Sequence, residues 1–587
     1  MLKRIDSRCE MGSNRKNINE IEDVETALRN AGACGLFHIW LILLTMLPFT
    51  LTSANMASSI FEGYIPNHRC DLPFVDSLEK KCNKTWTSTL HVKAAPLERS
   101  KSAACFRYQP GPEINCSYWF DPNNTTETPA NIDTVPCQKW TYDRSVMRNT
   151  IVTDFSLVCG STWASYISQS CFMLGVLLGS ILFGILSDRL GRRHTFLMCS
   201  VGGLITGTAT AFTQSYMSYG ILRTISGFFV IPPFLTLYVL VSEMVVVKYR
   251  VSFLQLTQVW FATGYILLSL VSYLAREWRT IQLVLSLLQA FSIVVWWFIP
   301  ESPRWLLCQH RHKEAQNVID MIYQYNHCLR RGDSDRHRLD RQLSITKDYD
   351  LVSELEEMKF KGYDVDRKQQ HGLRNLLGTP GIRKVSLVHF FHWFAIFCVY
   401  FGLTLNAAKL GGDSFFNLIV ASLMELISYV IVIPMTNKFG RVVFMSVSEV
   451  TAGILCIMMP YIAHVNWLYI TTSILGKFFI SFAFALMFIH VSEVFPTPIR
   501  SAATGMCSAW ARVGGIASPL IAMLTLIAPN LPYTIFGIIS LVTAFVILIL
   551  PETGNVKLPS TIEEGEEFIK SHPGPLLVLM RRFQRKT

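Results

Sequence analysis

The stretch Gly184–Arg193 reads GILSDRLGRR and places a dense group of charges between two long apolar runs. Arg189, Arg192 and Arg193 follow Asp188 within it. Because positive residues in short turns between membrane helices gather on the cytoplasmic side, the stretch indicates a cytoplasmic hairpin. Such charges either mark topology alone or form part of a gate between moving helices.

Composition places the chain in a membrane. It has 587 residues, of which 50% are hydrophobic and 16% charged, with a mean hydropathy of +0.32. Soluble proteins carry about 25% charged residues. The net charge of +11 lies in turns, one long polar segment and the C-terminal stretch. Cytoplasmic loops explain such a distribution, so nucleic acid is not an expected partner and the lipid bilayer is.

Hydropathy predicts twelve membrane spans in an all-α protein. Residues 1–32 are polar, without the apolar core of a signal peptide, and are expected to be cytoplasmic. Apolar runs long enough to cross a bilayer then follow. They cover about 33–60, 161–186, 195–213, 216–246, 252–275, 280–300, 385–406, 415–436, 442–463, 466–495, 501–528 and 531–551.

An internal repeat divides these spans into two halves. SDRLGRR at Ser187 recurs as TNKFGRV at Thr436, about 250 residues later. The Glu243/Arg250 pair after VSE recurs at Glu493/Arg500, and PESPRW at Pro300 recurs as PETGN at Pro551. The three motifs recur in the same order and at nearly the same distance along the chain. This predicts a parallel duplication, with two six-helix halves related by an axis along the membrane normal. The expected domains are a cytoplasmic N-terminus (1–32), an N-terminal half (33–300), a cytoplasmic linker (301–384), a C-terminal half (385–551) and a cytoplasmic tail (552–587).

Residues 61–160 are expected to form an extracellular loop. Six cysteines in a polar segment suit a disulfide framework, although their spacing does not fix the pairing. These are Cys70, Cys82, Cys105, Cys116, Cys137 and Cys159. The same segment holds sequons for N-glycosylation. They are at Asn83, Asn115, Asn123 and Asn124.

The motifs together resemble the major facilitator superfamily. GILSDRLGRR, PESPRWLL at Pro300–Leu307 and the sequence VSEVFPTPIR carry the resemblance. GYIPNHRC at Gly63–Cys70 and NTIVTDFSLVC at Asn149–Cys159 look like the organic cation, anion and zwitterion transporters of solute carrier family 22. Sugar porters share DRxGRR and PESPRW but lack this cysteine-rich loop. The resemblance implies a multi-pass plasma-membrane transporter with both termini cytoplasmic.

Charged residues at helix ends are expected to form an inner gate that breaks when the cavity opens inward. Only a network could bias such an equilibrium, because an exposed ion pair contributes about 0–1 kcal/mol. The candidates are Asp188, Arg189, Arg192, Arg193, Glu243, Arg250, Glu301, Arg304, Glu493 and Arg500. Since Asn437 replaces Asp188 in the second copy, the N-terminal half is expected to hold most of the gate.

Two charges inside the membrane are the best candidates for substrate contacts, because an ion there is costly without a partner. Arg512 lies twelve residues past Arg500, about 18 Å along a helix. Glu425 lies twelve residues before Asn437, so the two share one depth. They either pair with each other or have separate roles, with Arg512 receiving an anionic group and Glu425 meeting a cation, Arg512 or Lys477.

Aromatic residues at inner or central depths resemble family positions that line the cavity, and rings of this kind hold quaternary ammonium groups. They are Phe234, Tyr238, Phe261, Trp393 and Tyr400, with Gln258 as a further polar contact. Packing against neighbouring helices is the alternative for each ring. His392 is expected to be a helix-end histidine and not a proton relay.

Three functions are compatible with these features. The first is secondary or facilitative transport of small organic ions by alternating access, with zwitterions or cations such as carnitine-like quaternary amines ahead of organic anions. Arg512 stands where cation-selective members carry an acidic residue, and this argues against pure cation specificity. The second is a non-transporting receptor or sensor. The third, an enzyme, is disfavoured because HExxH, P-loop and G-x-S-x-G motifs are lacking in a plausible context. No metal or cofactor is expected; the coupling ion and oligomeric state stay open.

Overall fold

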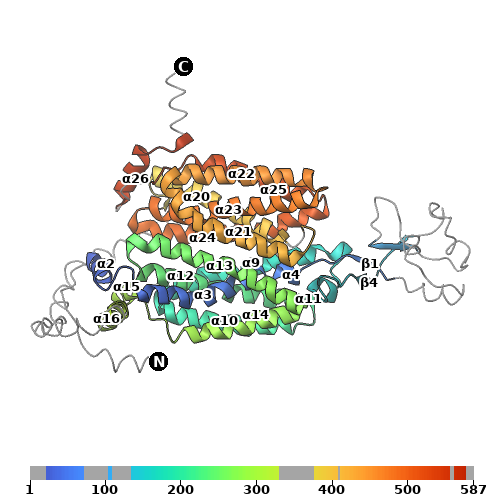
Figure 1. The fold of residues 1–587 in the computed structure, drawn as a ribbon, viewed down its shortest axis with the longest axis horizontal. Helices are drawn as coiled ribbons and strands as arrows, with labels where there is room; N and C mark the ends of the chain where they lie inside the picture. The colour runs from blue at the N-terminus through green and yellow to red at the C-terminus, as the bar shows by residue number, and fades with distance from the viewer. Residues whose placement is uncertain are drawn as a thin grey trace, which may run out of the picture.

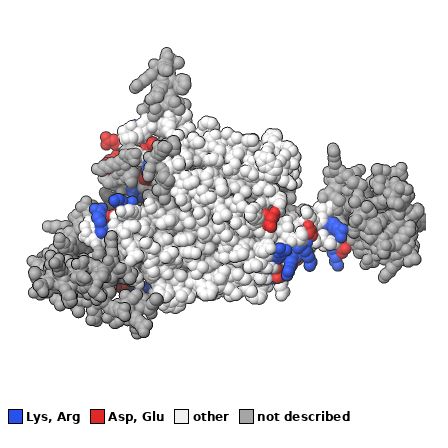
Figure 2. Space-filling model, in the orientation of Figure 1, with Lys and Arg blue, Asp and Glu red and all other residues white. Residues whose placement is uncertain are grey.

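The computed structural model describes residues 21–71, 104–108, 134–328, 376–407, 410–554, 559 and 561–576. Within them, helices run roughly parallel between two ends of a bundle (Figure 1). One end carries the short strands β1 and β4 and is called the disulfide end. The other carries α2, α15, α16 and α26 and is called the cap end. Charged side chains gather at these two ends and are scarce between them on the face drawn in Figure 2.

The N-terminal half supplies six of the twelve expected spans. The fourth is divided at Ile231, where Pro232 and Pro233 bring no N–H to the helix. The spans are α3 (Leu36–Ala57) with α4 (Ser59–Glu62), α9 (Trp163–Leu190), α10 (Arg192–Ala211), α11 (Tyr216–Val230) with α12 (Pro232–Met244), α13 (Val247–Ala275) and α14 (Trp278–Val295).

The C-terminal half supplies the other six. Asp413 caps the N-terminus of α21 by accepting hydrogen bonds from the N–H groups of Phe415 and Phe416. The spans are α20 (Pro380–Asn406), α21 (Ser414–Phe439), α22 (Arg441–Ile462), α23 (Asn466–Val494), α24 (Thr497–Met523) with η6 (Leu524–Leu526), and α25 (Leu531–Ile547).

Ten of the described helices are long and apolar enough to cross a membrane, and Leu531–Ile547 is a shorter apolar helix. The halves meet where α9 packs on α24 and α13 packs on α21. The predicted fold class, an all-α membrane bundle with a disulfide-containing loop, is confirmed.

Short strands and helices lie at the ends of the helix bundle. The disulfide end has two antiparallel pairs, β1 with β4 and β2 with β3. The bounds are β1 His68–Cys70, β2 Phe106–Tyr108, β3 Thr134–Pro136, β4 Trp140–Tyr142, α8 Ile151–Asp154 and η1 Cys159–Ser161. The cap end has α2 (Ile21–Asn30), α15 (Pro303–Cys308), α16 (His312–Cys328) and α26 (Ile562–Ser571).

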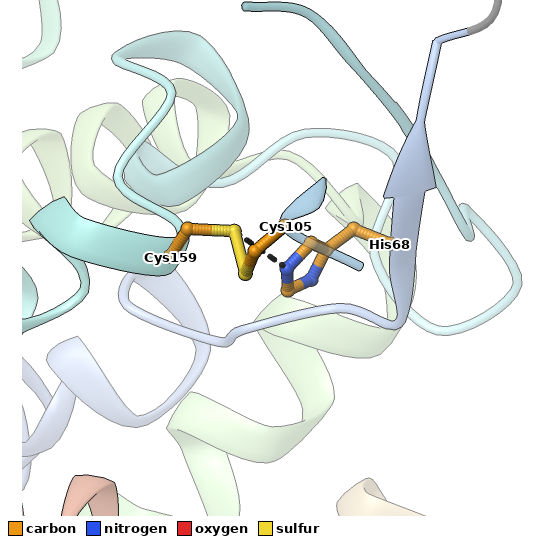
Figure 3. Close-up of side chains that lie close together, drawn as sticks. All are labelled: His68, Cys105 and Cys159. Atoms are coloured by element: carbon orange, nitrogen blue, oxygen red, sulfur yellow. Dashed lines mark hydrogen bonds between the residues drawn. A yellow bond between two sulfur atoms is a disulfide. The ribbon is translucent and has the colours of Figure 1, made fainter. Parts of the chain in front are cut away.

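Two disulfides join four of the six candidate cysteines: Cys70 to Cys137 and Cys105 to Cys159. Cys82, Cys116 and the sequons at Asn83, Asn115, Asn123 and Asn124 lie outside the described residues. The His68 ring lies beside the Cys105–Cys159 disulfide (Figure 3). The side-chain atoms of His68, Cys105 and Cys159 that could bind a metal ion are within 4.8 Å of one another. Both sulfurs are held in the disulfide, so this group lacks the thiolates that a metal ion requires.

Candidate functional site

Charges at the cap end of the N-terminal half form a tight cluster around Arg192. Its guanidinium donates to both oxygens of Glu243, at 3.1 and 2.9 Å, and lies 3.0 Å from Asp188. The Glu301 carboxylate accepts the backbone N–H groups of Arg192 and Arg193 at 2.9 and 3.1 Å. A carboxylate at this place satisfies the free N–H groups of α10 and faces the positive end of its dipole.

The C-terminal half builds an equivalent cluster. Glu552 accepts the backbone N–H groups of Arg441 and Val442 at 2.6 and 3.0 Å. The guanidinium of Arg441 pairs with Glu493 at 3.3 Å. Among the described residues the N-terminal half holds more of these ion pairs, because Arg192 also reaches Asp188 and Arg304 pairs with Glu25, but the second copy keeps the same core. Replacement of one aspartate by Asn437 leaves the arginine, the partner glutamate and the capping glutamate of the second copy in place.

Each cluster lies within its own half of the protein, and neither forms a contact between the two halves. Arg304 bonds the Glu243 carbonyl and pairs with Glu25 at 2.7 Å. Arg193 donates to the Trp296 carbonyl and lies over its ring.

Arg250 and Arg500, the arginines of the repeated motif, form no ion pair with its glutamates among the described residues. The Nε of Arg500 donates to the Phe495 carbonyl, and the Nε of Arg250 is buried without a partner among the described residues. The partner of Glu243 is Arg192. For Arg189, the described part of the chain gives no ion pair.

A buried ion pair occupies the middle of the C-terminal half. Lys477 Nζ lies 3.1 Å from Glu425 Oε2, donates to Thr404 at 2.5 Å and sits 3.1 Å from the centre of the Tyr400 ring. Tyr400 and Tyr429 donate to the other oxygen of Glu425 at 2.5 and 2.9 Å. Glu425 is 0% exposed and Lys477 4% exposed. Their charges therefore cancel inside the membrane.

Arg512 lies apart from this pair. It is buried, its guanidinium is 5.3 Å from the centre of the Phe397 ring, and its Nε has no partner among the described residues. The expected alternative, an ion pair between Arg512 and Glu425, is wrong, because Glu425 pairs with Lys477. Lys477 takes the Glu425 carboxylate, and among the described residues Arg512 forms no ion pair. The charge of Arg512 therefore lacks a carboxylate partner in the described part of the chain.

The predicted aromatic residues lie in a wall that crosses between the halves. Phe234 packs against Tyr238 and Phe261, and Phe261 packs edge-on to Tyr265. The hydroxyl groups of Tyr265 and Tyr400 are 3.2 Å apart across the boundary.

The wall continues in the C-terminal half. Trp393 packs against Phe397 and Phe488, and Tyr238 reaches Phe488 from the N-terminal half. The indole N–H of Trp393 is buried with no described partner, and Gln258 is buried. The wall therefore holds one unused hydrogen-bond donor.

A small cavity lies against the ion pair. It has a volume of about 10 Å³, and Tyr265, Thr404, Glu425 and Lys477 are among the residues that line it. That volume is enough for about one water molecule. This cavity is therefore too small for an organic ion.

Sequence reasoning named Lys477 only as one possible partner of Glu425 and missed Tyr265 and Tyr429. The signal for Lys477 was present, because a lysine inside a long apolar run needs a buried partner. No comparable signal marks the tyrosines, since an aromatic residue in a membrane helix is ordinary. Only packing shows that Tyr429 lies against Glu425 and Tyr265 lies against Lys477.

The sequence of this chain is similar to those of known membrane transporters. Residues 113–563 match the family described as "Sugar (and other) transporter". The chain is 32% identical to the "Organic cation transporter protein" of Drosophila melanogaster over 94% of this chain and 96% of that protein. It is 30% identical to "Solute carrier family 22 member 1" of Oryctolagus cuniculus over 92% of this chain and 95% of that protein.

Among solved structures, the partially occluded inward-open xylose transporter XylE from E. coli matches with a TM-score of 0.56 and 16% identity, over 89% of this chain and 99% of that chain. At that identity the match supports the fold alone. The fold and its paired charge clusters define a major facilitator transporter, which is a membrane protein and not an enzyme. Within that class, the chain belongs to solute carrier family 22.

Proposed function

We propose that the protein is a plasma-membrane transporter that moves small organic ions by alternating access, with both termini cytoplasmic. Relatives named as organic cation transporters support the class of substrate. The repeated clusters around Arg192 and Arg441 support two rigid halves that move as bodies. In this topology the cap end faces the cytoplasm and the disulfide end faces outward.

The uncompensated charge of Arg512 carries the proposal about the substrate. A buried guanidinium without a carboxylate partner is costly, and a bidentate bond to a substrate carboxylate would offset that cost. The aromatic wall beside it suits a quaternary or primary ammonium group. A zwitterion of the carnitine type satisfies both features.

An organic anion is the second candidate, and Lys477 favours it. Lys477 already occupies the face of Tyr400 and the carboxylate of Glu425, the places that a cation would otherwise use. A substrate with an anionic group alone would need only Arg512. A non-transporting receptor on the same fold is the alternative of another class.

Uptake in cells that express the protein tests these functions. We expect labelled carnitine to accumulate, with tetraethylammonium and p-aminohippurate as the cation and anion probes. Arg512→Ala should abolish uptake of carboxylate-bearing probes while surface delivery is unchanged, and Arg512→Lys should restore it only in part, because lysine lacks the bidentate fork. Uptake of none of the three at normal surface levels would favour the receptor. Unchanged carnitine transport by Arg512→Ala would remove Arg512 from the binding site.

A further inference from the structure

Four titratable side chains meet in the interior of the C-terminal half. His389 and His392 lie on α20, Glu449 on α22 and His490 on α23, and each is 0% exposed. His392 Nε2 is 2.7 Å from Glu449 Oε1, and His389 Nε2 is 3.0 Å from His490 Nδ1. No cluster of this kind is apparent in the sequence, because His389 and His490 are separated by 101 residues.

The hydrogen bonds fix where the protons lie on two of the rings. His490 Nε2 is 3.0 Å from the Pro551 carbonyl, and a carbonyl can only accept, so His490 Nε2 carries a hydrogen. In neutral His490, Nδ1 therefore accepts, and His389 Nε2 must donate to it. His389 Nδ1 is then a bare lone pair. It is buried and has no partner among the described residues.

The Glu449–His392 pair is also incomplete. Glu449 Oε2 and His392 Nδ1 are both buried without described partners. An isolated buried carboxylate is strongly disfavoured, so the pair holds one proton shared between carboxyl and imidazole. Buried polar atoms are nearly always hydrogen-bonded, and three unused atoms in one cluster indicate a function other than packing.

Few other charges reach the cluster. Those of Glu552 and Arg441 act on His490 from the cap end. From α25, Ser540 gives only a hydroxyl group, which bonds the Glu449 carbonyl at 2.8 Å. From α24, Arg512 lies against Phe397, further along α20. Glu552 and Arg441 are therefore the charges outside the cluster that act on it among the described residues.

The arrangement suits a proton better than a metal ion. Among the described residues, His68 with Cys105 and Cys159 is the group of at least three candidate ligands whose atoms converge within 4.8 Å. The atoms of the histidine cluster do not converge in this way. A bare imidazole nitrogen and a shared carboxyl proton remain, and groups of this kind gain or lose protons when their surroundings change between states.

We propose that His389, His392, His490 and Glu449 form a proton-binding site whose loading is linked to transport, so that the organic ion moves at the expense of a proton gradient. The inference rests on the proposed transport function. Its physical link is α20, which carries His392 and also Tyr400, about 12 Å further along the helix. Tyr400 donates to Glu425 in the polar centre. A proton changes the charge buried between α20, α22 and α23, and biases the position of α20 between states.

Proton binding can be measured without any substrate. Infrared difference spectra of the purified protein between acid and neutral pH should show a carboxylic-acid band that Glu449→Gln removes and an imidazole signal that His389→Gln reduces. His38→Gln is the matched control, because His38 is equally buried, bonds the Met244 carbonyl and lies in the other half. If His389→Gln does not fold, His389→Asn takes its place. Spectra unchanged by either cluster variant would overturn the site.

Transport coupling needs liposomes that contain the protein. We expect carnitine, tetraethylammonium or p-aminohippurate to accumulate under a pH gradient of one direction, up to about tenfold per pH unit for one proton per substrate. Glu449→Gln should lose this accumulation and keep exchange of labelled for unlabelled probe. Equal steady-state levels of the labelled probe under pH gradients of opposite direction would overturn the proposed coupling. If no probe is transported at all, the proposed function fails, while the spectra still decide whether the proton site exists.

Discussion

Arg512 and Lys477 are both buried cations, and their surroundings give them different roles. Lys477 has a carboxylate 3.1 Å away, so its charge is explained by the fold itself. Arg512 has an aromatic ring and an unused Nε. In the described part of the chain, Arg512 therefore lacks the carboxylate partner that Lys477 has.

Removal of one member of the Lys477–Glu425 pair should therefore be worse than removal of both. Lys477→Met leaves the Glu425 carboxylate buried without a cation and should lower the free energy of unfolding by about 3–5 kcal/mol. Lys477→Met combined with Glu425→Gln should recover much of that loss. The melting temperature of the detergent-purified protein measures both. A double variant as unstable as the single one would contradict the pairing.

Helix N-termini are the elements that the repeated charges stabilise. Glu301 and Glu552 occupy the same place at the start of α10 and α22, after Gly191 and Gly440 with φ of +96° and +83°. A positive φ of this kind favours glycine and turns the chain sharply into the next helix. The capping glutamates thus fix the hairpin in both halves.

Loss of either capping carboxylate should have a similar effect. Glu301→Gln and Glu552→Gln each keep the shape of the side chain but remove its charge, and each should cost about 1 kcal/mol in stability. The melting temperatures of the two variants, compared in one detergent, provide the measurement. A much larger loss for Glu301→Gln would contradict the equivalence of the two capping carboxylates.

The C-terminal helix α26 is held by a pH-sensitive contact. Glu566 accepts the N–H groups of Gly381 and Ile382 at the start of α20, at 3.0 and 3.2 Å. Burial raises the pKa of Glu566, but hydrogen bonds from Thr379, Gly381 and Ile382 and the charge of Lys570 outweigh this, so that the pKa is lowered overall. The contact therefore contributes stability above the ordinary glutamate pKa and loses it as the pH falls through the lowered value.

Hydrogen exchange of residues 561–571 checks this sign. After correction for the intrinsic effect of pH, protection of α26 should be constant near neutrality and fall in acid. Glu566→Gln should reduce protection near neutrality and remove most of the change in acid. Protection that rises as the pH falls would contradict the assignment.

At the scale of the whole molecule, the two halves are joined mainly near the disulfide end and in the middle. Tyr166 on α9 contacts Thr525 near the end of α24, at 3.3 Å. Ser269 donates to the Phe415 carbonyl, and Phe61 stacks on the Phe415 ring. On the cap side of the middle, Gln255 donates to the Ala485 carbonyl of the opposite half at 3.2 Å.

A crosslink across the disulfide end should therefore stop transport. Cysteines placed by Tyr166→Cys and Thr525→Cys and joined by a short bifunctional thiol reagent should hold the halves together, with near-complete loss of carnitine uptake. The matched control is Tyr469→Cys with Tyr533→Cys, whose hydroxyl groups are 3.1 Å apart within one half. The control crosslink should leave uptake intact. Equal loss in both would argue against movement of the halves as bodies.

The sequence by itself determined the membrane class, the spans and the duplication, because hydropathy and repeated motifs are local properties of the chain. It also placed Arg512 and Glu425 inside the membrane, since a charge in an apolar run is visible without a structure. The partners were decided by tertiary structure. Lys477 pairs with Glu425 because α21 packs on α23, and His389 meets His490 because α20 packs on α23. Such contacts depend on how helices rotate and pack, and sequence spacing does not encode that.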